Sequence, residues 1–307
     1  MQPIKGIALK LCSVLMFISM ASLIKATSDH VPPGEAVFFR SLFAVPVILG
    51  WLAVRGDLRT GLKVKSRMAH FWRGFVGTGA MGMMFAGLGF LPLPEVTAIG
   101  YAAPLLTVIF AAMFLGEHVG IFRLASVAMG IVGVLIILAP RMTLLSEETV
   151  QMTQAVGAVL TLMGAVCAAL AQIYIRKLVQ SEQTAAIVFY FSLTSTVLSL
   201  LTLPFGWVLP EPREAMLLIA AGFIGGLGQI FLTSAYRFAG ASVVAPFDYA
   251  SMIFALLIGY FVFSEVPTAQ MLTGAAIVIA AGVLIIWRES HLGLKRSKAR
   301  SGMTPQG

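Results

Sequence analysis

Five polar side chains interrupt long apolar stretches of the sequence, and their types suit binding rather than catalysis: Arg40, Tyr101, Gln229, Asp248 and Tyr249. A carboxylate well inside an apolar stretch is costly unless it is paired, hydrated or protonated. We therefore expect Asp248 to bind a cationic or hydrogen-bonding substrate, or to carry a coupling proton. The alternatives are a structural ion pair with Arg237 and a short reach to the polar boundary of the stretch.

The other four residues suit the lining of a cavity. Tyr101 and Tyr249 stand about seven or eight residues into their stretches, roughly 10–12 Å deep at 1.5 Å per helical residue, where a tyrosine either lines a cavity or packs in the core. Arg40 stands about four residues into its stretch, so that its head either reaches the surface or anchors substrate. Gln229 is a hydrogen-bonding candidate, and Gln172 is a weaker one.

Groups that could catalyse a reaction are missing from the sequence. It contains no GxxxxGK[ST] phosphate loop and no serine, cysteine or metal-ligand constellation. We expect no enzyme activity, no cofactor, no metal site and no direct use of ATP.

The composition places these residues in a membrane protein. Of 307 residues, 59% are hydrophobic and only 11% are charged, which is more apolar surface than a soluble core buries. The net charge of +8 could suggest nucleic acid, but the basic residues lie between apolar stretches rather than among aromatics on a polar face. The expected partners are the lipid bilayer and a small-molecule substrate, with no nucleic acid.

Runs of about 20 apolar residues, the length that crosses a bilayer as a helix, set the expected architecture. They cover residues 6–26, 36–54, 69–90, 94–115, 121–138, 154–175, 184–203, 215–236, 241–263 and 271–287. We predict an all-α membrane protein with ten transmembrane helices, five in residues 4–138 and five in residues 154–288, followed by a basic cytoplasmic tail at 289–307.

The two halves repeat one unit. Residues 74–117 align without a gap with residues 222–265, at an offset of 222 − 74 = 148, and the identities include Gly74/Gly222, Gly77/Gly225, Tyr101/Tyr249 and Glu117/Glu265. Since each half has an odd number of spans, the second half enters the membrane from the opposite side, so that the repeats are inverted around a central cavity. The four glycines let helices approach closely, either as static packing or as a sliding surface.

The Lys/Arg bias sets the orientation. With the N-terminus inside, the cytoplasmic loops and tail receive most of the basic residues, and the other side keeps only Lys25, Arg141 and Arg213. We predict a multi-pass protein of the cell inner membrane with both termini cytoplasmic. Inverted repeats suit alternating access, in which exchanging two packings moves the opening of a cavity from one face to the other.

Two segments carry a family resemblance. They run from Glu95 through Tyr101 to Leu-Gly-Glu117 and from Ala241 through Tyr249 to Ser-Glu265, and each precedes a glycine-rich helix ending Gly-Val-Leu-Ile-Ile. The chain resembles EamA-type transporters of the drug/metabolite transporter superfamily over essentially residues 4–288. The resemblance implies ten helices, two inverted EamA halves and a central cavity, and it leaves the direction of transport open.

The expected function is a secondary transporter or facilitator of a small organic metabolite. An aromatic cavity with few intramembrane charges favours a flat, partly apolar substrate. Among the family's substrate types, the chain, with Arg40 and the Glu95–Glu117 block, most resembles metabolite-uptake members, and this resemblance implies riboflavin uptake as the first choice; its ring could stack on tyrosine while its hydroxyls use Gln229 and Asp248. The alternatives are export of amino acids or drug-like amphiphiles, and uptake of S-adenosylmethionine. One chain should hold the whole path, as a monomer or in a homodimer.

Overall fold

The computed structural model describes residues 3–58, 60–115, 120–141, 149–239 and 245–301, and this part of the chain is helical, with no β-strand. The first half contains α1 (Pro3–Lys25), α2 (Pro33–Val54), α3 (Arg67–Phe90), α4 (Leu93–Gly100), α5 (Ala102–Leu115), α6 (Ile121–Leu138) and the 3-10 helix η1 (Ala139–Arg141). The second half contains α7 (Thr149–Leu178), α8 (Thr184–Ser199), η2 (Leu200–Phe205), α9 (Pro212–Phe238), η3 (Ala245–Tyr249), α11 (Ala250–Phe263) and α12 (Ala269–Ser301).

The helix boundaries follow local chemistry. Pro33 and Pro212 stand in the first turns of α2 and α9, where the missing N–H would have no partner. The side chain of Ser66 caps α3 by accepting from the Ala69 N–H. Glu214 closes a capping box on α9 and also bonds the ring of His30 at 2.9 Å, which raises the pKa of His30.

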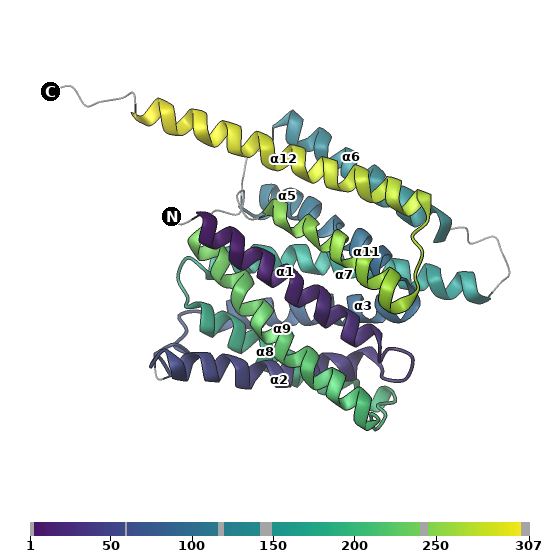
Figure 1. The fold of residues 1–307 in the computed structure, drawn as a ribbon. Coiled ribbons are helices and arrows are strands. Elements are labelled where there is room, and N and C mark those ends of the chain that lie inside the picture. Colours follow the sequence, from purple (N-terminus) through teal and green to yellow (C-terminus); the bar gives the residue numbers. More distant parts are fainter. Residues whose placement is uncertain (1–2, 59, 116–119, 142–148, 240–244, 302–307) are drawn as a thin grey trace.

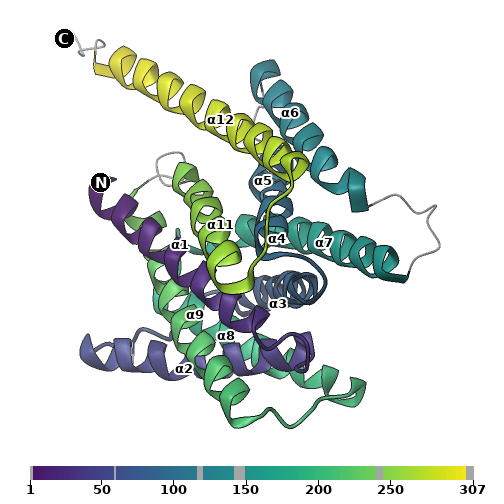
Figure 2. The ribbon, with the colours of Figure 1, turned by 45° about the vertical axis from the view of Figure 1, so that its right-hand side comes forward.

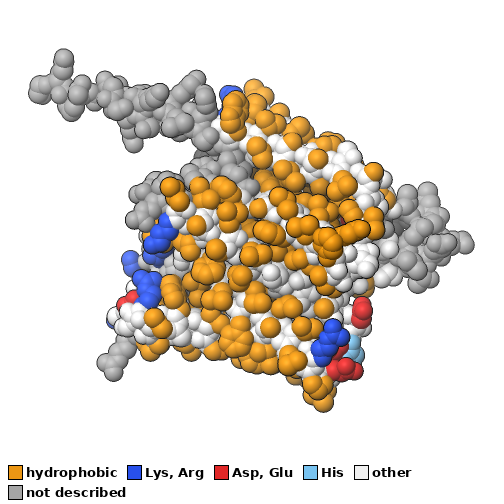
Figure 3. Space-filling model, in the orientation of Figure 1, with side chains coloured by type: hydrophobic (Ala, Val, Ile, Leu, Met, Phe, Trp, Pro, Cys, Tyr) orange, Lys and Arg blue, Asp and Glu red, His pale blue; other side chains and the backbone are white. Residues whose placement is uncertain are grey.

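The helices run side by side as a bundle (Figures 1 and 2). Helix α1 begins and α12 ends at the same end of this bundle (Figure 1), which we call the terminus end; the other is the opposite end. On the face drawn in Figure 3, hydrophobic side chains cover the middle, and charged side chains gather at the two ends. Six of the described helical stretches are long and apolar enough to cross a membrane. The chain is a multi-pass membrane protein, as its composition predicts.

The helices differ from the predicted spans in several places. The described part of the span expected at 241–263 is divided between η3 and α11. The span expected at 94–115 is interrupted at Tyr101, between α4 and α5, and Pro104 follows in the first turn of α5. Helix α12 continues beyond residue 287 through much of the expected basic tail. Helix α3 is as long as predicted but is not among the six stretches that are long and apolar enough to cross a membrane, because it carries several glycines together with His70 and Arg73. Glu117 and the loop at 142–148 lie outside the described residues.

The two halves interlock. Helix α1 packs on α9, and α7 packs on α3. Helix α2 also packs on α9, α8 packs on α3, and α6 packs on α12. All five of these contacts join the first half of the chain to the second.

Two of the predicted packing glycines lie at these contacts. A Cβ at Gly74 would lie 2.6 Å from Cβ of Thr194 on α8, and a Cβ at Gly222 would lie 2.4 Å from Cβ of Phe43 and 3.1 Å from the Phe39 carbonyl on α2. Both positions allow a closer approach than any larger residue would.

Replacing Gly222 by alanine should destabilise the bundle by about 1–3 kcal/mol, because the methyl group meets backbone atoms of α2 that cannot move aside. Gly79→Ala is the matched control, since its Cβ would meet only Cε of Met83 at 3.9 Å, and its better helix propensity makes it neutral or stabilising. Thermal unfolding in detergent measures both. Equal unfolding temperatures for the two variants would contradict close packing at Gly222.

Candidate functional site

A cavity of about 470 Å³ lies between the two halves. Its walls come from α1 to α5, α7 to α9, η3, α11 and α12. Most of the lining is apolar, and the polar groups that reach it include Lys10, Arg40, Arg73, Gln229 and Asp248. All five residues singled out from the sequence line this cavity.

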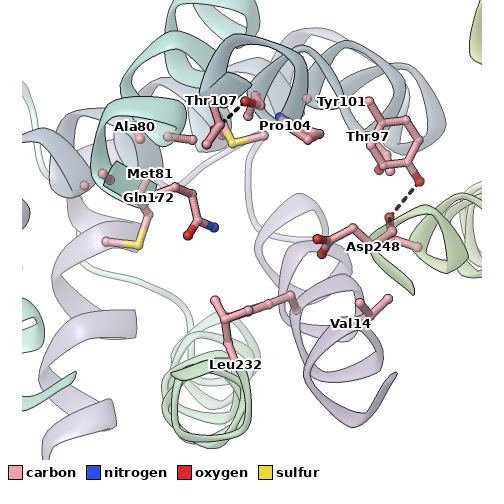
Figure 4. Close-up of a pocket in the computed structure, with 18 of the residues that line it drawn as sticks. Val14, Ala80, Met81, Thr97, Tyr101, Pro104, Thr107, Gln172, Leu232 and Asp248 are labelled. Atoms are coloured by element: carbon pink, nitrogen blue, oxygen red, sulfur yellow. Dashed lines mark hydrogen bonds between the residues drawn. The ribbon is translucent and has the colours of Figure 1, made fainter. Parts of the chain in front are cut away.

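Asp248 forms an ion pair that the sequence did not reveal. Its carboxylate lies 2.6 Å from Nζ of Lys10 on α1, whose side chain is 2% exposed, whereas the Asp248 side chain is 37% exposed. In Figure 4 the Asp248 carboxylate and the Gln172 amide face the same open space. The alternative pairing with Arg237 is wrong: among the described residues Asp248 pairs with Lys10 and not with Arg237, whose guanidinium donates to the Glu182 carbonyl. Asp248 is thus paired on one side and open to the cavity on the other.

Tyr101 and Tyr249 meet instead of flanking the centre separately. Their rings contact edge to face with centroids 5.0 Å apart. The Tyr101 hydroxyl lies 2.8 Å from Oγ of Ser251 and donates to the Tyr249 carbonyl at 3.2 Å. A Cβ at Gly282 would overlap the Tyr249 hydroxyl, so that α12 leaves room for this ring. The equivalent tyrosines join the two helix breaks, α4/α5 and η3/α11, beside the cavity.

Arg40 is 1% exposed, so the interpretation that its head reaches the surface is wrong. It donates to the Gly225 carbonyl at 3.4 Å and lies over the Phe191 ring. A second arginine, Arg73 of α3, lies over the same ring. Arg73 and Lys10 were not predicted from the sequence, although each is a basic residue several positions inside an apolar stretch. Gln229 Oε1 is buried, with no hydrogen-bond partner in the described structure.

A cluster of polar contacts closes the opposite end of the bundle near the cavity. Nζ of Lys25 lies 2.9 Å from Oε1 of Glu265 and donates to the carbonyls of Leu88 and Leu91. The other oxygen of Glu265 accepts from the Leu93 N–H at 2.9 Å. We call this set the Lys25–Glu265 clasp. It ties the end of α1 and the α3–α4 connection to the segment after α11, and thereby joins the two halves.

These features, a helical membrane bundle and a partly polar cavity between its halves, define a membrane transport protein. The family model for the EamA-like transporter family matches residues 4–139 and 155–287. The chain belongs to this family. The family and the similar proteins described below are membrane transporters and not enzymes. A crystal structure with 19% sequence identity has the same fold, with a TM-score of 0.67 over 94% of this chain and 98% of its own.

Similar proteins include transporters that act in opposite directions. The pseudopaline exporter CntI of Pseudomonas aeruginosa is 30% identical over 283 residues, which cover 91% of this chain and 95% of the exporter. The S-adenosylmethionine uptake transporter of Rickettsia felis is 29% identical over 255 residues, which cover 83% of each chain.

The energetic coupling between Lys10 and Asp248 can be tested by removing one charge and then both. Asp248→Asn should destabilise the protein by about 1–3 kcal/mol, since it leaves the buried Lys10 without a counter-charge. Adding Lys10→Met in the same chain should recover part of this loss, because no unpaired charge then remains. Thermal unfolding in detergent reports both effects.

Asp57→Asn is the control for this pair. Asp57 lies 3.8 Å from Arg55 with both side chains exposed, so the change should alter the free energy of unfolding by about 0.5 kcal/mol or less. Additive losses in the Lys10/Asp248 double variant would mean that the two groups do not act as a pair.

Proposed function

We propose that the chain is a secondary transporter that moves a small organic metabolite across the cell inner membrane by alternating access through the cavity between its halves. The observation that carries this proposal is the cavity itself, which is lined from both halves and contains charged groups that a static bundle does not need. Intramembrane charges that face a cavity are typical of a substrate or ion pathway. One chain supplies the whole lining, which is compatible with a monomer or a homodimer.

The proposed architecture is ten transmembrane helices in two inverted repeats, residues 4–138 and 154–288. It is supported by the exchange of equivalent contacts between the halves: α1 on α9 with α7 on α3, and α2 on α9 with α8 on α3. The contact between Tyr101 and Tyr249, which are equivalent at an offset of 249 − 101 = 148, is a further support. Such a pair belongs on a pseudo-two-fold axis in the membrane plane.

The orientation we propose places the terminus end in the cytoplasm. Figure 1 supports a common side for the start of α1 and the end of α12, and the Lys/Arg bias of the loops favours the inside for that side. The opposite end, with the Lys25–Glu265 clasp, then faces outward.

The clasp is the proposed outer gate. It connects both halves at the outward end, and Lys25 and Glu265 are each 14% exposed. Opening the cavity outward requires these contacts to separate, and each closed state gains them again. Alternating access is then a competition between the clasp and contacts that close the cytoplasmic end.

The substrate class follows from the charges and the relatives. Riboflavin uptake, the first expectation from sequence, rested on a resemblance to metabolite-uptake members of the family and on an aromatic cavity with few intramembrane charges. The cavity contains Lys10, Arg40, Arg73 and Asp248, and the similar proteins do not support riboflavin either. We propose a charged organic metabolite instead, of the kind represented by S-adenosylmethionine, which a relative takes up. Export, as in the pseudopaline exporter, uses the same cavity in the reverse direction.

Purified protein reconstituted alone in liposomes should take up radiolabelled S-adenosylmethionine with saturation, and unlabelled substrate inside should accelerate the uptake by counterflow. Asp248→Asn should lower the initial rate at least about tenfold, a loss of about 1.4 kcal/mol or more, whereas Asp57→Asn should not change it. Riboflavin and amino acids are tested in parallel. Non-saturable flux without counterflow would indicate a pore and reject the transporter proposal.

Weakening the clasp should favour opening at the outward end. In a variant with Cys12 and Cys167 replaced by alanine, a cysteine at Ala21, which lines the cavity, reports access to an impermeant thiol reagent added outside intact cells. Lys25→Gln should increase the labelling rate several-fold, because the ion pair with Glu265 is lost. Lys5→Gln, a basic residue at the other end of α1, is the control. Unchanged labelling in Lys25→Gln would exclude the clasp as a gate.

A further inference from the structure

Two guanidinium groups lie deep in the bundle and line the cavity. Arg40 comes from α2 and Arg73 from α3, and their side chains are 1% and 5% exposed. They converge on one aromatic ring: Cζ of Arg73 lies 3.6 Å, and Cζ of Arg40 5.4 Å, from the centroid of Phe191 on α8. Two positive charges thus share one small region of the cavity wall, which we call the arginine pair.

In the described structure several N–H donors of the arginine pair have no hydrogen-bond partner. Arg40 makes one long hydrogen bond, to the Gly225 carbonyl at 3.4 Å. Nε and Nη1 of both arginines are buried without a hydrogen-bond partner, and within the described residues no carboxylate lies within 4.0 Å of either. Lys10, which lines the same cavity, does have a carboxylate partner.

Gly77 and Gly225 leave space for the two guanidinium groups. A Cβ at Gly77 would lie 2.5 Å from Nη1 of Arg73, and a Cβ at Gly225 would lie 3.0 Å from Nε of Arg40. These glycines are equivalent in the two repeats, at an offset of 225 − 77 = 148. A Cβ would also lie 2.6 Å from Sδ of Met20 at Gly225 and 2.9 Å from the Phe191 ring at Gly77, so the two glycines serve both helix packing and the placement of the guanidinium groups.

Two like charges without counter-charges are unfavourable in such a place. Burying an unpaired ion costs several kcal/mol, and the contact with the Phe191 face returns only part of this. Arginine presents planar donors that match the two oxygens of a carboxylate. The missing component is an anion that enters the cavity and leaves it again.

We propose that the arginine pair binds the carboxylate of the transported metabolite, an inference that rests on the proposed transport function. The half-exposed carboxylate of Asp248 lies on the same cavity and receives a cationic group of the same molecule. The substrate is therefore an amphoteric carboxylate with an apolar body that fits the largely apolar walls. Bound substrate supplies the counter-charge that both arginines lack.

The first experiment measures binding without transport. Purified full-length protein in detergent is unfolded thermally with benzoate, with benzamide, which has the same shape without the charge, or with phenyl phosphate, at constant ionic strength set with chloride. Benzoate at tenfold its dissociation constant should raise the unfolding temperature by about 2–4 °C, and benzamide should not. Equal shifts for benzoate and benzamide, or a shift with phenyl phosphate alone, would overturn the carboxylate assignment.

The variants then assign the site. Arg40→Met and Arg73→Met should each abolish the benzoate shift, while without ligand they unfold at or above the wild-type temperature, because each removes an unpaired buried charge. Arg40→Lys and Arg73→Lys should retain a smaller shift, since a lysine keeps the charge but loses the planar donors. Arg55→Met, an exposed arginine on the terminus side of α2, should behave as wild type. Methionine variants that unfold earlier or fail to fold, or that keep the full benzoate shift, would show a structural role instead.

A last comparison separates this inference from the proposed function. S-adenosylmethionine carries a carboxylate that its decarboxylated analogue lacks, and the wild type should transport the first at least about tenfold better, with the preference lost in Arg73→Met. Flux without that preference would overturn the arginine pair as a substrate site and leave transport intact. Absent flux with an arginine-dependent benzoate shift would reject transport and keep the anion site.

Discussion

The constraint on which this structure depends is the cost of charge inside an apolar bundle. Lipid offers no counter-charge and little water, so each buried ion needs a partner within the protein or one that arrives. Lys10 has Asp248 and Lys25 has Glu265, and both pairs join helices that are distant in the sequence. Arg40 and Arg73 have no such partner in the described structure. Paired ions hold the halves together, and unpaired ions define where a ligand is needed.

Hydrophobic length and repeated glycine and tyrosine positions made the membrane bundle predictable, because these are local properties of the chain. The sequence also led to Asp248, Arg40 and both tyrosines, since a polar residue in an apolar stretch is conspicuous. It did not reveal which groups meet. Lys10 and Arg73 resembled the basic residues that flank spans, and only the packing of α1 on α9 and of α3 on α8 shows them to be buried.

The two helix breaks lie at the cavity, because Tyr101 and Tyr249, the residues at the breaks, both line it. A continuous helix at Tyr101 would satisfy its own backbone, whereas the helix is interrupted between α4 and α5, and the second half is interrupted in the same way between η3 and α11. The two tyrosines fill the junction by contacting each other. Irregular backbone is tolerated in a membrane only where it is covered by protein or lines a cavity, and here it does both.

The interlocking of the halves has a consequence for biosynthesis. Lys10 leaves the ribosome 248 − 10 = 238 residues before the carboxylate that neutralises it. At a synthesis rate of roughly 5–20 residues per second, this is a delay of about 12–48 s. During almost all of this time α1 has neither its ionic partner nor the complete helix α9 (Pro212–Phe238) on which it packs. The nascent first half must therefore wait in an incomplete state, with Lys10 at the interface or inside the insertion machinery, and native assembly can only follow the synthesis of nearly the whole chain.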